Sequence, residues 1–266
     1  MTKKALLIGI NYIDTNVALR GCINDVNNIN NILKTNNFNI TMLTDTSTVK
    51  PIKQNIINSL KWLINDCKSG DTLLFYYCGH GSQIKDTDGD ESDKLDEVIV
   101  PLDYRKNGVI TDDFLYDNIK LKGGVNFYGF TDCCHSGSIC DLKFNYTPSC
   151  GLKQGIITNG MPYIPLNWTD TFTTQLLTKD YILGNVFFIS GCKDNQISEE
   201  TNTSQGAFTV CFLKFLRENI INGIFVNNKF KLKDILKYIH CNLQMNRFKQ
   251  VPVMSSNKET TSFFNL

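Results

Sequence analysis

Apolar runs of strand length alternate with helical stripes through the first part of this chain. Strands are predicted at 4–10, 38–43 and 72–77, and apolar residues at helical spacing occupy 23–33 and 51–64. An order of strand, helix, strand, helix, strand is typical of a parallel sheet covered on both faces. The sequence therefore predicts the α/β class, with a central and mostly parallel sheet.

The second half of the chain interrupts this pattern and then resumes it. Segment 145–185 holds three prolines among polar residues, which predicts a linker or surface excursion within a single domain spanning 1–266. The apolar run 250–254 contains Pro252, which favours an edge strand. Further strands are expected at 98–100, 125–131 and 186–190, and further helices at 112–119, 208–221 and 232–243. Asp112 or Asp113 is the candidate cap of the helix at 112–119.

Composition excludes several classes of protein. The 266 residues are 42% hydrophobic and 20% charged with a net charge of +1, so a nucleic-acid partner is not expected. The N-terminal apolar run is too short to span a membrane and lacks a signal-peptide cleavage site. Ten cysteines without a Cys-x-x-Cys pair predict neither a structural zinc site nor a disulfide framework. We therefore expect a cytoplasmic protein that does not contact membranes.

Two predicted strands end in glycine-containing turns that carry reactive side chains. His80 lies between two glycines after the strand at 72–77, and Cys133 and Cys134 follow the strand at 125–131. The carboxyl ends of neighbouring parallel strands share one crevice, so these side chains are expected to meet. A thiol beside an imidazole is the minimum for nucleophilic catalysis by cysteine. A cysteine hydrolase is therefore the leading hypothesis.

Alternatives exist for each partner of this pair. His135 directly follows Cys134, so the two side chains are expected to diverge, and His240 lies in a helical pattern where packing is the simpler explanation. Cys133 and Cys134 both remain candidate nucleophiles, with Cys134 favoured because it begins the turn. A thiol phosphatase is excluded because no arginine follows Cys134 at phosphate-loop spacing. Candidate oxyanion donors are the backbone N–H groups of Ser136, Gly137 and Gly81.

Acidic residues gather between 86 and 97. Their spacing matches part of an EF-hand loop, but Glu91 stands where that loop needs glycine, and a strand precedes the segment, so an EF-hand is excluded. A calcium site assembled from several loops and a solvated acidic loop both stay open. Asp25 is likewise either a helix cap or, together with Cys22, a residue of the predicted crevice.

The ordered set of motifs resembles the type I metacaspases along nearly the whole chain. Any one motif is weak, whereas the set in this order is specific. The matching segments are Leu19–Asp25, Tyr77–Ser82, Asp88–Asp93, Leu95–Glu97, Ile110–Asp113, Asp132–Gly137 and Ser190–Gln196.

This resemblance implies a caspase-like three-layer sandwich in which 1–144 is large-subunit-like and 186–266 is small-subunit-like. It also implies a cysteine endopeptidase that cleaves peptides and proteins after arginine or lysine. The residues that match the family's catalytic dyad are His80 as base and Cys134 as nucleophile, which decides against Cys133.

The resemblance further implies a substrate pocket and an activating calcium site, and no organic cofactor. Two carboxylates in the pocket would attract a cationic side chain and repel an acidic one. Cys78 stands where many members carry serine. The matching pocket residues are Cys22, Asp25, Cys78 and Asp132, and the matching calcium ligands are Asp96, Asp112, Asp113 and Asp141.

Two departures from the family pattern complete the expectations. The sequence begins at the first predicted strand, so an N-terminal prodomain is expected to be absent. Segment 145–185 has no alignable pattern, and Lys143, Lys153 and Lys179 are candidate self-cleavage sites around it. We expect a monomer. The alternative function, an inactive caspase-like binding module, is disfavoured because the dyad and pocket acids are all retained.

Overall fold

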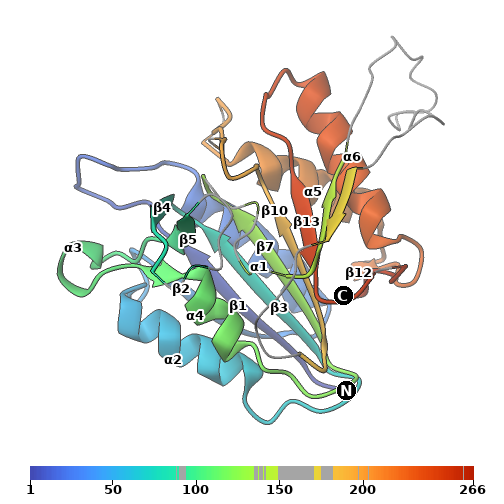
Figure 1. Ribbon diagram of the computed structural model, residues 1–266. Helices are drawn as coiled ribbons and strands as arrows, with labels where there is room; N and C mark the ends of the chain where they lie inside the picture. Colours follow the sequence, from blue (N-terminus) through green and yellow to red (C-terminus); the bar gives the residue numbers. More distant parts are fainter. Residues whose placement is uncertain are drawn as a thin grey trace.

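An eight-stranded sheet forms the centre of the molecule (Figure 1). The computed structural model describes residues 1–87, 89, 94–134, 137, 140, 142–148, 171–174, 182–196, 198–202, 204–259 and 261–266. The strands of this sheet are β1 (Lys3–Gly9), β2 (Asn39–Thr44), β3 (Thr72–Cys78), β7 (Asn126–Asp132), β8 (Phe144–Thr147), β9 (Thr171–Thr174), β10 (Asn185–Ser190) and β13 (Val253–Ser256).

Six helices and two small sheets complete the described fold. The helices are α1 (Cys22–Thr35), α2 (Lys53–Ile64), α3 (Tyr104–Asn107), α4 (Asp112–Asn118), α5 (Ala207–Glu218) and α6 (Leu232–Met245). The small sheets consist of β4 (Gly81–Lys85), β5 (Leu95–Ile99) and β6 (Ile110–Thr111), and of β11 (Ile220–Ile221) and β12 (Ile224–Phe225).

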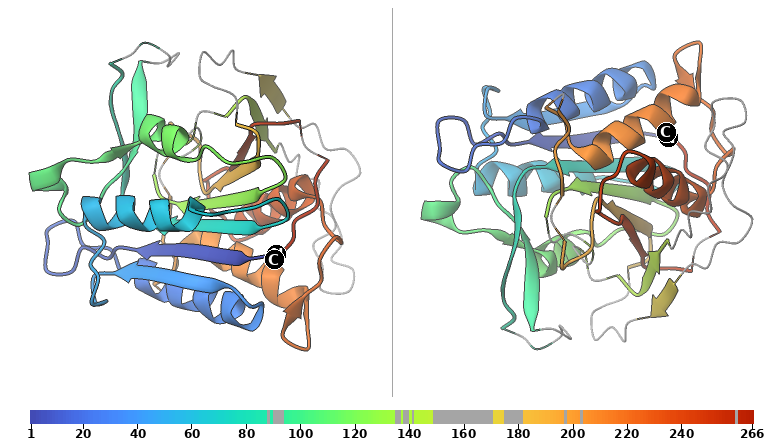
Figure 2. Two further views of the ribbon diagram at one scale, coloured as in Figure 1. Left: turned by 90° about the horizontal axis from the view of Figure 1, so that it is seen from below. Right: turned by 90° about the horizontal axis from the view of Figure 1, so that it is seen from above.

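The sheet has a parallel half and an antiparallel half. Its order is β2-β1-β3-β7-β10-β13-β8-β9, and the first five strands run parallel while the last three pair antiparallel. Helices lie on both faces of this sheet (Figure 2). The predicted α/β class and three-layer arrangement are confirmed.

Alternating side chains divide the interior into two hydrophobic cores. In β1, Ala5 and Leu7 pack toward α1, α5 and α6, whereas Leu6 and Ile8 pack toward α2 and α4. All four side chains are fully buried. Continuous apolar strands of this kind are typical of parallel sheets with helices on both faces. The same alternation decides which side chains at the strand ends face each helix layer.

Two local predictions were wrong. The strand predicted at an edge is β13, and it lies inside the sheet between β10 and β8. Pro252 comes just before the strand, so its missing N–H removes no hydrogen bond between β13 and its neighbours. Helix α4 is capped by Thr111, whose hydroxyl accepts a hydrogen bond from the Phe114 N–H at 3.2 Å, and not by Asp112 or Asp113. Most of segment 145–185, for which a linker or surface excursion is predicted, lies outside the described residues; its described part includes β9 and all but the first residue of β8.

The two ends of the chain lie together. Lys3 Nζ donates a hydrogen bond of 2.8 Å to the Leu266 carbonyl. Both ends lie where β1 begins, far from the carboxyl ends of the parallel strands (Figure 1). Across the described residues, no helix combines the length and the apolar character needed to cross a membrane.

Close packing around Gly129 gives a prediction about stability. A Cβ at this position would overlap the ring of Phe188, which is fully buried against Phe75 and Phe127. Gly129→Ala should therefore lower the free energy of unfolding by about 1–3 kcal/mol, measured by urea denaturation. Gly123→Ala is the control, because a Cβ there meets nothing within 4 Å. Equal stability of the two variants would contradict the packing described here.

Candidate active site

The candidate site lies where β1, β3 and β7 end. Strands β3 and β7 are hydrogen-bonded neighbours, and Cys78 pairs in register with Asp132. Strands β2 and β3 lie on opposite sides of β1, so the order of the strands reverses direction at β1. The carboxyl end of β1 is therefore a switch point of the topology. Crevices in open α/β sheets form at such points. The predicted convergence of the turns after the two strands is therefore confirmed.

The backbone of His80 is fixed by two buried tyrosines. The His80 N–H donates to the Tyr12 hydroxyl at 3.0 Å, and the Tyr77 hydroxyl donates to the His80 carbonyl at 2.7 Å. Tyr12 also donates to the Val100 carbonyl at 2.6 Å. Burial raises the pKa of both phenols, so they remain neutral hydrogen-bonding groups. These contacts hold the histidine turn at the end of β3.

The orientation of the imidazole is set by Val17. His80 Nε2 lies 2.7 Å from the Val17 carbonyl oxygen, which can only accept a hydrogen bond. Nε2 therefore carries a proton, and in the neutral ring Nδ1 is the acceptor. The ring also packs against Tyr12, with centroids 4.6 Å apart. The imidazole is thus positioned to accept a proton at Nδ1.

The loops of the two candidate reactive residues touch. A Cβ added to Gly81 would overlap the carbonyl oxygen of Cys134, so only glycine permits this approach. Cys133 is 1% exposed and packs in the core that faces α2, whereas Cys134 is partly exposed. Of the two thiols, Cys134 is therefore the one that a substrate can reach. His240 is buried on α6, and His135 and Ser136 lie outside the described residues.

Burial raises the pKa of the Cys134 thiol. The negative charge of Asp132 adds to this effect, while a backbone hydrogen bond from Ser198 opposes it. At neutral pH the thiol is therefore protonated. Because thiolate is the attacking form, the sulfur needs a nearby base to act as a nucleophile.

Two carboxylates lie buried on the face of the sheet that α1 and α5 cover. Asp25 is fully buried and accepts from the Gly206 N–H at 2.8 Å and from Gln205 Nε2 at 3.4 Å. Asp132 is 4% exposed and accepts from the N–H and the hydroxyl of Thr209 at 3.0 and 2.6 Å. Neither carboxylate has an ion-pair partner among the described residues.

With no cationic partner among the described residues, burial dominates the electrostatics of these two carboxyl groups. Burial and the neighbouring Asp132 raise the pKa of Asp25 to about 8. Burial also raises the pKa of Asp132, although hydrogen bonds from Ser198 and Thr209 oppose the shift. A bound cation would lower the pKa of both carboxyl groups again, because an opposite charge favours the ionised form of a carboxyl group.

Two cysteines complete the predicted pocket set. Cys22 begins α1 and Cys78 ends β3, and each is 3% exposed. Cys78 Sγ lies 3.6 Å from Asp25 Oδ2 and also contacts the Cys22 thiol. The structure thus brings together all four residues that the sequence assigned to a pocket.

The loop before α5 closes over these residues. The Ser198 hydroxyl donates to Asp132, and Gly206 lies so close that a Cβ there would overlap the Asp132 carboxylate. Glu200 ties the loop to the start of α1 by accepting from the Arg20 and Gly21 N–H groups at 3.1 and 2.9 Å. In this conformation the four pocket side chains are almost inaccessible to solvent.

The predicted calcium ligands lie away from this pocket, at the sheet of β4, β5 and β6. Asp96 is on β5, and Asp112 begins α4, where its carboxylate accepts from the Glu97 N–H at 2.7 Å and the Asp113 N–H at 2.8 Å. Asp96 and Asp112 are buried and Asp113 is partly exposed. Asp141 lies outside the described residues. The three described carboxylates offer only oxygen donors, which fits a hard cation such as calcium.

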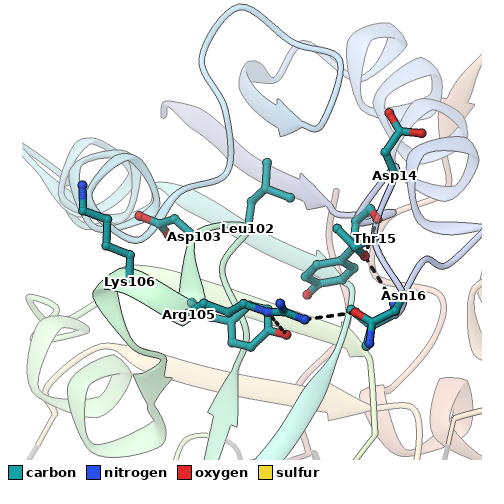
Figure 3. A pocket seen from close by; sticks show the side chains of 10 residues that line it. Asp14, Thr15, Asn16, Leu102, Asp103, Arg105 and Lys106 are labelled. Atoms are coloured by element: carbon teal, nitrogen blue, oxygen red, sulfur yellow. Dashed lines mark hydrogen bonds between the residues drawn. The ribbon is translucent and has the colours of Figure 1, made fainter.

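A cavity of about 400 Å³ adjoins the loop that holds His80. Its lining includes Tyr12 and Val17, which contact the histidine, and α3 forms the opposite wall. Figure 3 shows Arg105 reaching across the cavity to Asn16, with Nη2 3.0 Å from the Asn16 side-chain oxygen. This cavity therefore lies next to the residues that position His80.

Sequence reasoning missed several residues that shape the site. Tyr12 and Val17 position His80, and Ser198 and Thr209 hold Asp132. The first two follow β1, so the rule that strand ends share a crevice could have identified them. Thr209 lies on α5 and has no local signal; only the packing of that helix brings it to Asp132.

Comparisons with known proteins point to one family. A model described as the metacaspase, peptidase C14 domain matches residues 3–143. Metacaspase-3 of Trypanosoma brucei brucei is 35% identical over 97% of this chain and 71% of its own length. Metacaspase-1 of Lodderomyces elongisporus is 35% identical over 82% of this chain, and the match spans 58% of that protein.

A solved structure supports the fold independently. The crystal structure of a protein from Geobacter sulfurreducens superimposes with a TM-score of 0.63 at 22% identity, covering 99% of this chain and 93% of the other. At this identity the likeness concerns the fold alone.

Proposed function

Because the chain belongs to the metacaspase family, we propose that it is a cysteine endopeptidase that cleaves after arginine or lysine. The activity is supported by the partly exposed Cys134 thiol beside the histidine turn. The preference for a basic side chain is supported by one observation above all: two buried carboxylates lie in the crevice without a cationic partner among the described residues.

In the proposed reaction His80 is the base and Cys134 the nucleophile. Nδ1 of His80 takes the thiol proton while the Val17 carbonyl holds Nε2–H. The thiolate attacks the scissile carbonyl carbon, and the imidazolium then protonates the leaving amine. Water, deprotonated by the same imidazole, hydrolyses the acyl-enzyme and restores the thiol. Backbone N–H groups near Cys134, including those of Gly81 and Gly137, are the candidate donors to the oxyanion.

The proposed substrate side chain enters between Asp25 and Asp132. Its positive charge would favour ionisation of both carboxyl groups and form two attractive pairs in a buried site. An acidic side chain in the same place would instead bring a further negative charge to the pocket. Because the loop before α5 covers the pocket, substrate binding requires this loop to move.

Calcium is proposed as the activating ion. Asp96, Asp112 and Asp113 would hold it, with Asp141 as the fourth carboxylate. The ion would supply positive charge that neutralises the acidic residues around β5 and α4. In the proposal, the bound ion orders the sheet of β4, β5 and β6. Because β4 directly follows His80, this ordering favours the state in which the loop before α5 has moved away from the pocket.

The first functional prediction concerns cleavage. The protein should hydrolyse Arg- and Lys-ended fluorogenic peptides in the presence of calcium and leave the Asp-ended peptide intact. Cys134→Ala should lower the rate by at least about a thousandfold, because the residue forms the covalent intermediate. Cys133→Ala is the matched control and should retain most activity, since that thiol is buried on the other face. Complete inactivity of the folded wild type with calcium would favour the inactive binding module instead.

A second prediction concerns protons in the pocket. With its pKa at about 8, Asp25 is mostly protonated at pH 7 when no cation is bound, and a cation favours its ionised form. Binding of N-acetylarginine amide to the Cys134→Ala variant at pH 7 should therefore release about one proton. Calorimetry in buffers of different ionisation enthalpy measures this number. The release should fall as pH rises above 8 and vanish in Asp25→Asn. Binding without proton release at pH 7 would argue against a neutral Asp25.

A third prediction concerns calcium. Asp113→Ala removes a partly exposed carboxylate from the proposed ligand set and should raise the calcium concentration needed for half-maximal activity. Calcium titration of the cleavage rate measures the shift. Asp117→Ala, which removes an exposed carboxylate paired with Lys120, is the control. Superimposable titrations of wild type and Asp113→Ala would remove Asp113 from the proposed site.

A further inference from the structure

The substrate pocket contains sulfur as well as oxygen. Cys22 and Cys78 are free thiols in contact with each other, and each is 3% exposed. They come from the start of α1 and the end of β3, so no local sequence spacing relates them. A pocket that binds only a basic side chain has no chemical need for paired thiols.

The donor atoms are close enough to share one ion. One donor atom each of Asp25, Cys78 and Asp132 lies within 4.8 Å of the other two. Tetrahedral zinc, with bonds of about 2.0–2.3 Å, places its ligand atoms roughly 3.3–3.8 Å apart, so a contraction of about 1 Å closes the set. Cys22 is not one of these three residues, but its side chain contacts Cys78 and is the candidate for the fourth donor.

The chemistry of this set differs from that of the acidic residues at the small sheet. Thiolate ligands favour zinc and other borderline or soft ions, whereas oxygen-only sites favour calcium or magnesium. The two pocket carboxylates also lack a cation among the described residues. A small divalent ion would satisfy both the charge and the sulfur donors.

We propose that the pocket is also a binding site for a thiophilic divalent cation such as Zn²⁺, held by Cys22, Asp25, Cys78 and Asp132. Since Asp25 and Asp132 are the groups assigned to the basic side chain of the substrate, the ion and the substrate exclude each other. This exclusion rests on the proposed function, whereas binding of the ion does not. The ion would act as an inhibitor that competes for the pocket.

Cobalt provides the direct test because thiolate-bound Co²⁺ has a characteristic absorption in the near ultraviolet. The protein is used without a metal-binding tag and with Cys134→Ala, which removes the thiol beside His80 as an alternative ligand. Co²⁺ should produce the thiolate band, and Zn²⁺ should abolish it. Because loss of even an outer-shell partner weakens metal binding by about 10–100-fold, Cys78→Ser should weaken Zn²⁺ binding by at least about tenfold.

Two further variants make the test decisive. Cys22→Ser should also weaken binding, whereas Cys67→Ser, which changes a buried thiol in the segment after α2, should not. Thermal unfolding of each variant verifies that it is folded. A missing thiolate band, or a band that persists unchanged in both folded pocket variants, would overturn the proposal.

Competition separates the inference from the proposed function. N-acetylarginine amide should displace Co²⁺ from the Cys134→Ala protein. If the thiolate band depends on Cys78 but Arg-ended peptides are never cleaved, the metal site stands and the peptidase proposal falls. If those peptides are cleaved but no thiolate band forms, the peptidase proposal stands and the metal site falls. Simultaneous binding of both ligands would overturn the proposed exclusion.

Discussion

Two carboxyl groups buried side by side, whose simultaneous ionisation is unfavourable, are the central constraint of this structure. Burying a carboxylate is unfavourable unless a counter-charge or hydrogen bonds compensate for lost hydration. Among the described residues, Asp25 and Asp132 are compensated by hydrogen bonds from α5 and from the loop before it, and not by a cation. The described elements that meet here are thus organised around a site without a positively charged partner.

This arrangement links the resting state of the pocket to its ligands. The groups that donate hydrogen bonds to the two carboxylates also cover them. A ligand must therefore displace these groups before it can take their place. A basic side chain and a thiophilic ion would do so by different chemistry, one through hydrogen-bonded ion pairs and the other through bonds to sulfur. The reactive loops are less adaptable, because Gly81 and Cys134 are in contact and His80 is fixed by two tyrosines.

The parts of the structure that depend on periodicity could be predicted from the sequence. The strand and helix order, and the meeting of the turns after β3 and β7, follow from alternating apolar segments. Position within the sheet could not be predicted: β13 was expected at an edge because Pro252 is close to it, yet the proline lies just outside the ladder. The pocket residues came from family motifs, and their hydrogen-bond donors were missed because Thr209 reaches Asp132 only through the packing of α5.

The pairing of Lys3 with the Leu266 carbonyl has a practical consequence for experiments. Both termini lie near the start of β1, while the parallel strands end on the opposite side of the sheet, where the candidate site lies (Figure 1). A fluorophore or surface anchor fused to either terminus would therefore leave the crevice accessible. Immobilised protein could then be exposed in turn to peptides and metal ions, and each binding event followed on the same sample.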